Sequence, residues 1–101
     1  MGKASRDKGA RGERQVVSLL RDYGLTDAER TGEWKVDDIY VTIAGEKRTI
    51  EVKVRAKGAS AGLIYEALEG GVFGVAHKAD RKDWILSLRL KDFLEMIKKP
   101  L

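Results

Sequence analysis

Two carboxylates and a lysine lie in two short segments of the chain, Asp38-Ile39 and Glu51-Val52-Lys53. Carboxylate oxygens are the ligands that hard divalent cations prefer in proteins. A lysine beside such a cation supplies positive charge where a reacting phosphoryl group gains negative charge. These residue types are therefore the smallest set that can hold a divalent cation against a phosphodiester.

Both segments belong to stretches in which apolar and polar residues alternate. The apolar positions are Ile39, Val41 and Ile43 in the first stretch and Ile50, Val52 and Val54 in the second. Alternation with a period of two predicts half-buried strands, here about 36–44 and 47–55, joined by a turn at Ala44-Gly45-Glu46-Lys47. One face of this hairpin should pack on the core, and the other should carry the polar residues.

The register of the hairpin depends on which two residues form the centre of the turn. If Gly45-Glu46 form a type II′ turn, Asp38 lies opposite Lys53 and Tyr40 lies opposite Glu51. Asp38 and Glu51 are then diagonal neighbours, roughly 5 to 8 Å apart at their Cβ atoms and within reach of one shared ion. Without further acids, Asp38 and Lys53 would be an exposed cross-strand ion pair worth about 0.2 to 1 kcal/mol.

A third acid, Glu13, lies on a predicted helix from about Asp7, a candidate N-cap, to Tyr23. The helix carries an apolar stripe of Val16, Val17, Leu19, Leu20 and Tyr23 and ends at Gly24. Continued towards the N-terminus, the stripe reaches Glu13, which should lie at the edge of the buried face. Two carboxylates about 4 Å apart repel by about 4 kcal/mol at an effective dielectric of 20, which a metal ion or Lys53 would have to offset.

Composition limits the kind of site that this chain can form. The 101 residues include no cysteine and one histidine, His77, so thiolate and multi-histidine metal sites are excluded. A bound metal would be oxygen-ligated, which favours Mg²⁺ or Mn²⁺. No apolar stretch has membrane-spanning length and no signal-peptide pattern opens the chain, so we expect no membrane association and a cytoplasmic protein, in the host cytoplasm if phage-encoded.

The remaining pattern predicts a single α/β domain over residues 1–101, with a mixed central sheet that contains the hairpin and is flanked by helices. The further predicted elements are a short strand near 29–31, a helix capped by Ser60 and ended by Gly70-Gly71, a buried strand from Val72 to His77, a strand from Trp84 to Leu88 and a helix from Asp92 to Lys98. The crossover through the middle helix allows the strands on either side of it to pair in parallel. The stripe of Leu90, Phe93, Leu94 and Ile97 is most simply a core face.

The net charge of +4 is concentrated near the N-terminus, where Lys3, Arg6, Lys8, Arg11 and Arg14 follow one another. Residues 1–6 are predicted to form a flexible basic arm. Such an arm suits contacts with phosphates, although a basic run alone is more often a solvated tail. Beside an acidic cluster, it suggests a polyanionic substrate combined with metal chemistry.

With these residues placed, the chain resembles the PD-(D/E)xK nuclease superfamily and, within it, the archaeal-type Holliday junction resolvases. The matching motifs are Lys8-Gly9-Ala10-Arg11-Gly12-Glu13-Arg14, Arg30-Thr31-Gly32, Asp38-Ile39 and Glu51-Val52-Lys53-x-Arg55. The resemblance implies a restriction-endonuclease-like fold and structure-specific, metal-dependent DNA cleavage. It also implies a homodimer whose two active sites cut opposing strands of a four-way junction.

Carried over residue by residue, the resemblance makes Asp38 and Glu51 metal ligands and has Lys53 orient the attacking water and stabilise the developing charge. Glu13 would complete the acidic site, as a catalytic residue and further ligand. The residues implied to contact DNA are Lys8, Arg11, Arg14, Arg30, Thr31 and Arg55. Asp37 stands where the family often has proline, so its share in metal binding is open.

The sequence leaves three alternative functions open, and it also predicts a dimer interface. The chain can instead be a general or other branched-DNA nuclease, a noncatalytic DNA-binding module on the same fold, or a protein whose hairpin face is only solvated. For the dimer, the predicted interface is the segment from Val72 to Val75 together with part of the final helix.

Overall fold

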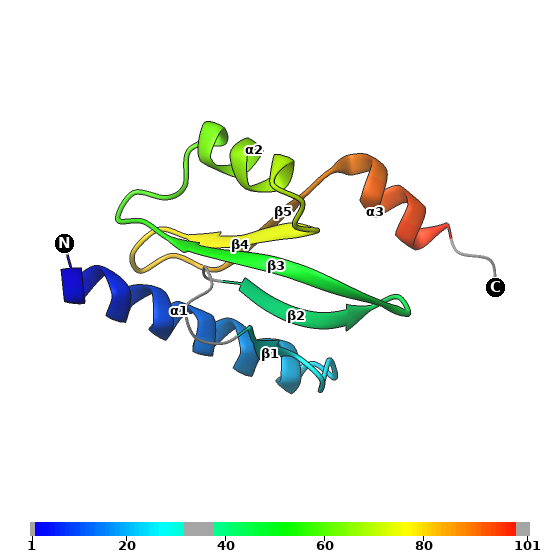
Figure 1. The fold of residues 1–101 in the computed structure, drawn as a ribbon, viewed down its shortest axis with the longest axis horizontal. Helices are drawn as coiled ribbons and strands as arrows, with labels where there is room; N and C mark the ends of the chain where they lie inside the picture. The colour runs from blue at the N-terminus through cyan, green and yellow to red at the C-terminus, as the bar shows by residue number, and fades with distance from the viewer. Residues whose placement is uncertain (1, 32–37, 99–101) are drawn as a thin grey trace.

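The computed structural model describes residues 2–31 and 38–98, with the side chains of 8–31 and 39–98 (Figure 1). In this part of the chain the elements are α1 (Gly2–Asp22), β1 (Glu29–Arg30), β2 (Asp38–Ile43), β3 (Glu46–Val54), α2 (Ala61–Glu69), β4 (Gly74–Lys78), β5 (Ile85–Leu88) and α3 (Leu90–Ile97). Their order is the predicted one, and they form a single α/β domain.

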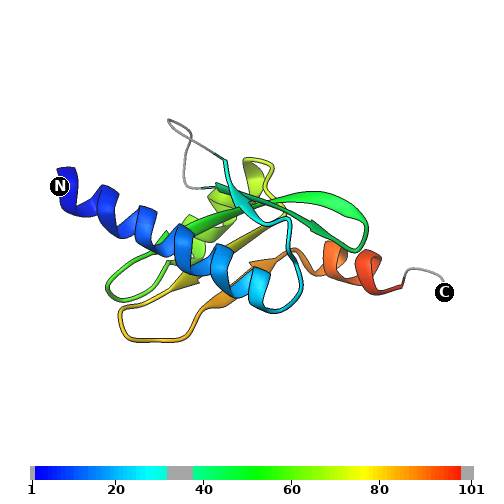
Figure 2. The same ribbon diagram turned by 90° about the horizontal axis from the view of Figure 1, so that it is seen from below.

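The strands form one mixed sheet in the order β1-β2-β3-β4-β5. The pair β3 and β4 is parallel, as the crossover through α2 predicts, and the other three pairs are antiparallel. The sheet separates the two longer helices, with α1 along one face and α2 above the other (Figures 1 and 2). A side chain on β3 therefore faces either α1 or α2.

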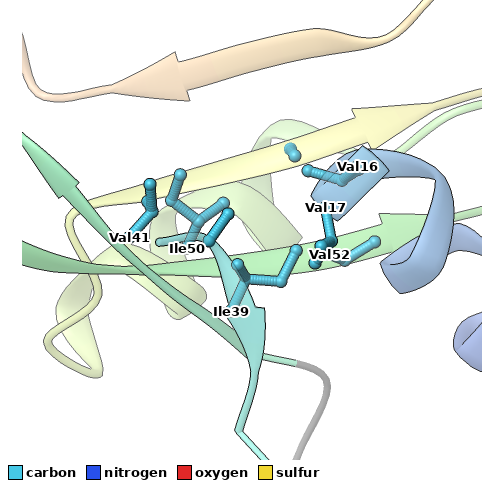
Figure 3. Close-up of a cluster of buried hydrophobic side chains, with 8 residues drawn as sticks. Val16, Val17, Ile39, Val41, Ile50 and Val52 are labelled. Carbon is cyan, nitrogen blue, oxygen red and sulfur yellow. The ribbon is translucent and has the colours of Figure 1, made fainter. Parts of the chain in front are cut away.

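The apolar residues of the hairpin pack on α1. Ile39, Val41, Ile50 and Val52 are buried against Val16 and Val17 (Figure 3). A second cluster on the other face joins Ala67 and Leu68 of α2 to Val72 and Val75. Since even-numbered residues of β3 face α1, the intervening Glu51 and Lys53 are left on the side of α2.

Two predicted helix boundaries have different outcomes. Helix α1 begins at Gly2, so the predicted helix start near Asp7 is wrong, and Met1 lies outside the described residues. Helix α2 is capped as predicted, because the Ser60 side chain accepts a hydrogen bond of 3.1 Å from the backbone N–H of Leu63. The basic residues near the N-terminus are therefore presented on a helix.

The hairpin register differs from the predicted one by two residues along β3. Ile43 pairs with Glu46, so the central turn residues are Ala44 and Gly45, with φ of 53° and 82°. Positive φ at both positions is the signature of a type I′ turn, whose twist suits a two-residue hairpin. The pairing of Asp38 with Lys53 is therefore wrong, and Asp38 pairs directly with Glu51. The shift is by an even number, so each residue keeps the face predicted for it.

The turn gives a stability prediction. An alanine in the left-handed region costs about 1 to 2 kcal/mol, whereas asparagine tolerates this conformation. We expect Ala44→Asn to raise the free energy of unfolding by about 1 kcal/mol in urea denaturation. Gly45→Ala is the reverse control, because its Cβ would meet no atom within 4 Å and only its φ of 82° opposes it. Equal stabilities of all three proteins would contradict the type I′ assignment.

Two further predictions about apolar segments fail. The segment from Val72 to Val75 is buried within the domain and leads into β4, which lies between β3 and β5, so it cannot form a dimer interface. The stripe on α3 is not a core face: Leu90, Phe93, Leu94 and Ile97 are all exposed, and no residue of this helix is buried. Within the described residues, no helix is long and apolar enough to cross a membrane.

Candidate active site

Glu51 and Lys53 lie together at a cleft between β3 and α2. The Lys53 Nζ is 2.8 Å from the Glu51 Oε2, and the two side chains are only 18% and 15% exposed. The cleft has a volume of about 360 Å³, and its lining adds Leu63, Glu66, Ala67, Gly70 and Val72. The predicted Glu-x-Lys pair is thus partly screened from water and still open to a ligand.

Asp38 begins strand β2 and is the direct register partner of Glu51. Directly opposed residues are the nearest cross-strand neighbours in an antiparallel pair. Asp38 and Glu51 are therefore directly opposed, whereas the sequence predicted that they are diagonal neighbours. Asp37 lies outside the described residues.

Glu66 is a residue of the cleft that sequence reasoning did not select. It lies on α2 and lines the same cleft as Glu51 and Lys53. The sequence contains one indication of this position. Leu63, Ala67 and Leu68 determine which side of the helix meets the sheet, and Glu66 is adjacent to that side. The position of the cleft relative to α2, however, follows only from the fold.

Glu13 lies at the edge of the buried face, as its place in the stripe predicts, and is itself buried. Its Oε1 accepts a hydrogen bond of 2.8 Å from the Nε of Arg30 on β1. The helix that carries it covers the opposite face from α2 (Figure 1). Among the described side chains, which do not include that of Asp38, no three His, Cys, Asp or Glu residues form a metal-binding group. A catalytic role of Glu13 stays a prediction.

The other residues expected to contact DNA are distributed over several elements. Lys8 forms a 3.1 Å ion pair with Asp80, which follows β4, and the Nη1 of Arg55 donates to the carbonyl oxygen of Val54. Arg11 and Arg14 are exposed on α1, and Thr31 is half-buried after β1. Arg14 and Arg30 line a hollow next to α1, separate from the Glu51 cleft. Gly32 of the predicted loop motif lies outside the described residues.

His77 lies on β4 in register with Lys53. It is buried, and its Nε2 shares a hydrogen bond of 2.8 Å with the Oγ of Ser87. Burial lowers the pKa of His77 below its ordinary value of 6.5, because desolvation disfavours the charged ring. The side chain is therefore neutral at pH 7.

This lowered pKa predicts a pH-dependent stability. The unfolded chain binds a proton on His77 near pH 6.5, whereas the folded chain binds it only at lower pH. We expect the free energy of unfolding to fall as the pH is lowered from about 7 through the unfolded pKa towards the folded one. His77→Gln should flatten the curve in this range, since no other histidine is present. Equal slopes for both proteins in urea denaturation would contradict this prediction.

The described aromatic side chains on or beside these strands contact neighbouring residues of the domain. Trp84 packs against the buried cluster that contains Val16 and Val17, and the Lys78 Nζ lies 5.8 Å from its ring centroid. Tyr40 is exposed on β2 beside Lys47, whose Nζ is 5.9 Å from the ring centroid. Trp34 lies outside the described residues.

Comparison of the chain with protein-family models, with curated proteins and with solved structures gave no match. The chemistry of the site therefore has to be argued from its residues. A carboxylate and an ammonium group meet in a cleft next to a second strand that begins with an aspartate. Such a set is able to hold a hard cation and to place a positive charge beside an anionic substrate.

Proposed function

We propose that the protein is a metal-dependent DNA endonuclease with a restriction-endonuclease-like fold, whose active site contains Asp38, Glu51 and Lys53. The observation that carries this proposal is the Glu51 and Lys53 pair, 2.8 Å apart in a cleft, with Asp38 as the register partner of Glu51. A purely structural ion pair requires neither the cleft nor a further acid opposite it. Metal-assisted phosphodiester hydrolysis uses carboxylates that hold the cation and a positive charge that stabilises the developing negative charge.

The donor set fits Mg²⁺ or Mn²⁺. The charged groups that line the described cleft are the carboxylates of Glu51 and Glu66 and the ammonium of Lys53, with no histidine among them. We place the cation on Asp38 and Glu51, because carboxylates suit these hard ions. When bound, the cation supplies Lewis-acid activation of the phosphoryl group and lowers the pKa of a bound water.

Lys53 acts from a fixed position in this proposal. Its ammonium group is held by Glu51, so its long side chain loses little further freedom when a substrate arrives. It orients the attacking water and stabilises the negative charge that develops on the scissile phosphate. The apolar side chains Leu63, Ala67 and Val72 restrict water on the other side of the cleft, which strengthens this electrostatic contribution.

Glu13 has a positioning role in this account. Its buried carboxylate holds Arg30 on β1, the strand that pairs with β2 next to Asp38. Arg30 and the cations of α1 contact the DNA backbone, as the resemblance implies. Glu13→Gln should then affect DNA affinity at least as strongly as the rate of cleavage.

Four-way junctions are the substrate that we favour, with a homodimer as the active form. A two-fold dimer presents two symmetric sites, which suits paired cuts on opposing strands. The surface that we assign to the second copy consists of exposed Ile85 and Leu86 on β5 and the exposed apolar stripe of α3. Strand β5 ends the described sheet, so its outer edge is open to a second chain.

The test is incubation of labelled four-way junction, linear duplex and single strand with the protein in Mg²⁺ or in EDTA. We expect paired cuts in the junction with Mg²⁺ and none in EDTA, and twice the chain mass in light scattering. A monomer that cuts linear duplex equally well would reject the junction assignment and leave the nuclease standing. Tight DNA binding without cleavage under any metal would favour the noncatalytic binding module, and neither binding nor cleavage would reject both.

A further inference from the structure

A second charged hollow lies next to α1, apart from the Glu51 cleft. It has a volume of about 470 Å³ and is lined by Arg14, Val17, Ser18, Arg21, Asp22 and Arg30. Arg14, Ser18 and Arg21 follow at helical spacing on α1, and Arg30 approaches from β1. The hollow and the Glu51 cleft have no lining residue in common.

Two of the three arginines are fixed through one nitrogen. The Nε of Arg21 donates to the carbonyl oxygen of Ala28 over 2.9 Å, and the Nε of Arg30 donates to Glu13 over 2.8 Å. A guanidinium group has five N–H donors in a planar fork, so these bonds orient the fork and leave its terminal nitrogens available. Within the described residues, no hydrogen bond or ion pair is recorded for Arg14.

The charge of the hollow is positive. Three guanidinium groups line the hollow with one carboxylate, that of Asp22, while the Glu13 carboxylate bonded to Arg30 offsets one further charge, and the Ser18 hydroxyl adds a neutral donor. Guanidinium forks match the oxygen atoms of a phosphate, and the Asp22 carboxylate limits the number of phosphates that the hollow accepts. The described structure thus offers a site for one tetrahedral oxyanion.

We propose that this hollow binds one phosphate of a nucleic-acid backbone, through Arg14, Arg21 and Arg30. The choice of nucleic acid as the partner rests on the proposed function, whereas the phosphate chemistry rests on the hollow itself. In this proposal Glu13 and the Ala28 carbonyl hold the guanidinium groups apart and pre-aligned, which lowers the entropy lost on binding. DNA is therefore held at a place outside the catalytic cleft.

The experiment is a salt series of duplex DNA affinity, measured by fluorescence anisotropy in EDTA so that no cleavage occurs. Each phosphate neutralised contributes about 0.9 to the slope of log K against log salt concentration. Arg14→Gln, Arg21→Gln and the double variant are compared with Lys91→Gln, which removes one exposed cation from α3. Thermal unfolding confirms that each variant folds, and Arg14→Gln removes none of the described hydrogen bonds.

We expect the double variant to lower the slope by about 0.9, as one shared phosphate requires, and to lower affinity more than Lys91→Gln does. A fall of about 1.8 would mean two independent contacts and would overturn the shared site. Equal effects of Lys91→Gln and the hollow variants would overturn it too. Inorganic phosphate that shifts the NMR signals of Arg14 and Arg21, with unchanged DNA affinity in the variants, would assign the hollow to a free anion instead. If the unmodified protein shows this binding pattern in EDTA but cleaves no DNA with Mg²⁺, only the proposed nuclease activity is rejected.

Discussion

Asp38→Asn and Glu51→Gln are each expected to reduce metal-dependent DNA cleavage by about 10³-fold or more, because each removes a carboxylate proposed to hold the cation. A metal ion contributes several kcal/mol to the stabilisation of a phosphoryl transition state, and each 1.36 kcal/mol corresponds to a factor of ten in rate. DNA affinity in EDTA should stay the same or rise, since each substitution removes a negative charge near the substrate. Single-turnover cleavage of labelled junction DNA measures the effect.

Glu46→Gln is the matched control for these two variants. Glu46 lies on β3 as Glu51 does, but it is exposed at the hairpin turn and lies 3.8 Å from Arg48. Its replacement removes the same charge from the same strand away from the cleft. Cleavage by Glu46→Gln should match that of the unmodified protein, and retained cleavage by both Asp38→Asn and Glu51→Gln would place the active site elsewhere.

Gly12→Ala is expected to destabilise the fold by about 1 to 3 kcal/mol, because side chains on the sheet lie close to α1 at this glycine. A Cβ at Gly12 would lie 2.9 Å from the Cγ2 of Val54 and 3.4 Å from the Cη2 of Trp84. Real Cβ atoms are almost never closer than 3.0 Å to a neighbour, so the Val54 side chain, the helix or β3 must move. Urea denaturation measures the loss.

Gly62→Ala is the control for the packing argument. Gly62 lies in α2, and its Cβ would meet only the Oγ of Ser60, at 4.0 Å. Alanine is the better helix former by about 1 kcal/mol, so this substitution should stabilise the protein. If both substitutions changed stability in the same direction by similar amounts, close packing at Gly12 would not be their cause.

The order of the elements and the mixed sheet could be predicted from the sequence because they depend on local patterns. Ser60 before an apolar repeat predicted a capped helix, and alternation around Ile39 and Ile50 predicted the buried face of the hairpin. The start of α1 was missed because the charged residues before Asp7 carry no apolar stripe. The failure at α3 has a similar origin, since a stripe indicates an apolar face without indicating what covers it.

The candidate site was predicted only in part. Glu51 and Lys53 share a face because of the period of a strand, which the sequence displays. The direct pairing of Asp38 with Glu51 was missed because it depends on an alanine adopting positive φ in the turn, contrary to its usual preference. Glu66 lines the cleft and Arg21 lines the hollow because α2 and α1 pack on the sheet. No local sequence pattern predicts how these helices pack.

The central claim is that Asp38 and Glu51 form a site for a hard divalent cation. Titration of the DNA-free protein with Mn²⁺, followed by the electron paramagnetic resonance signal of the free ion, tests it most directly. We expect saturable Mn²⁺ binding that is lost in Glu51→Gln and retained in Glu46→Gln. Equal Mn²⁺ binding by the unmodified protein and Glu51→Gln would contradict it.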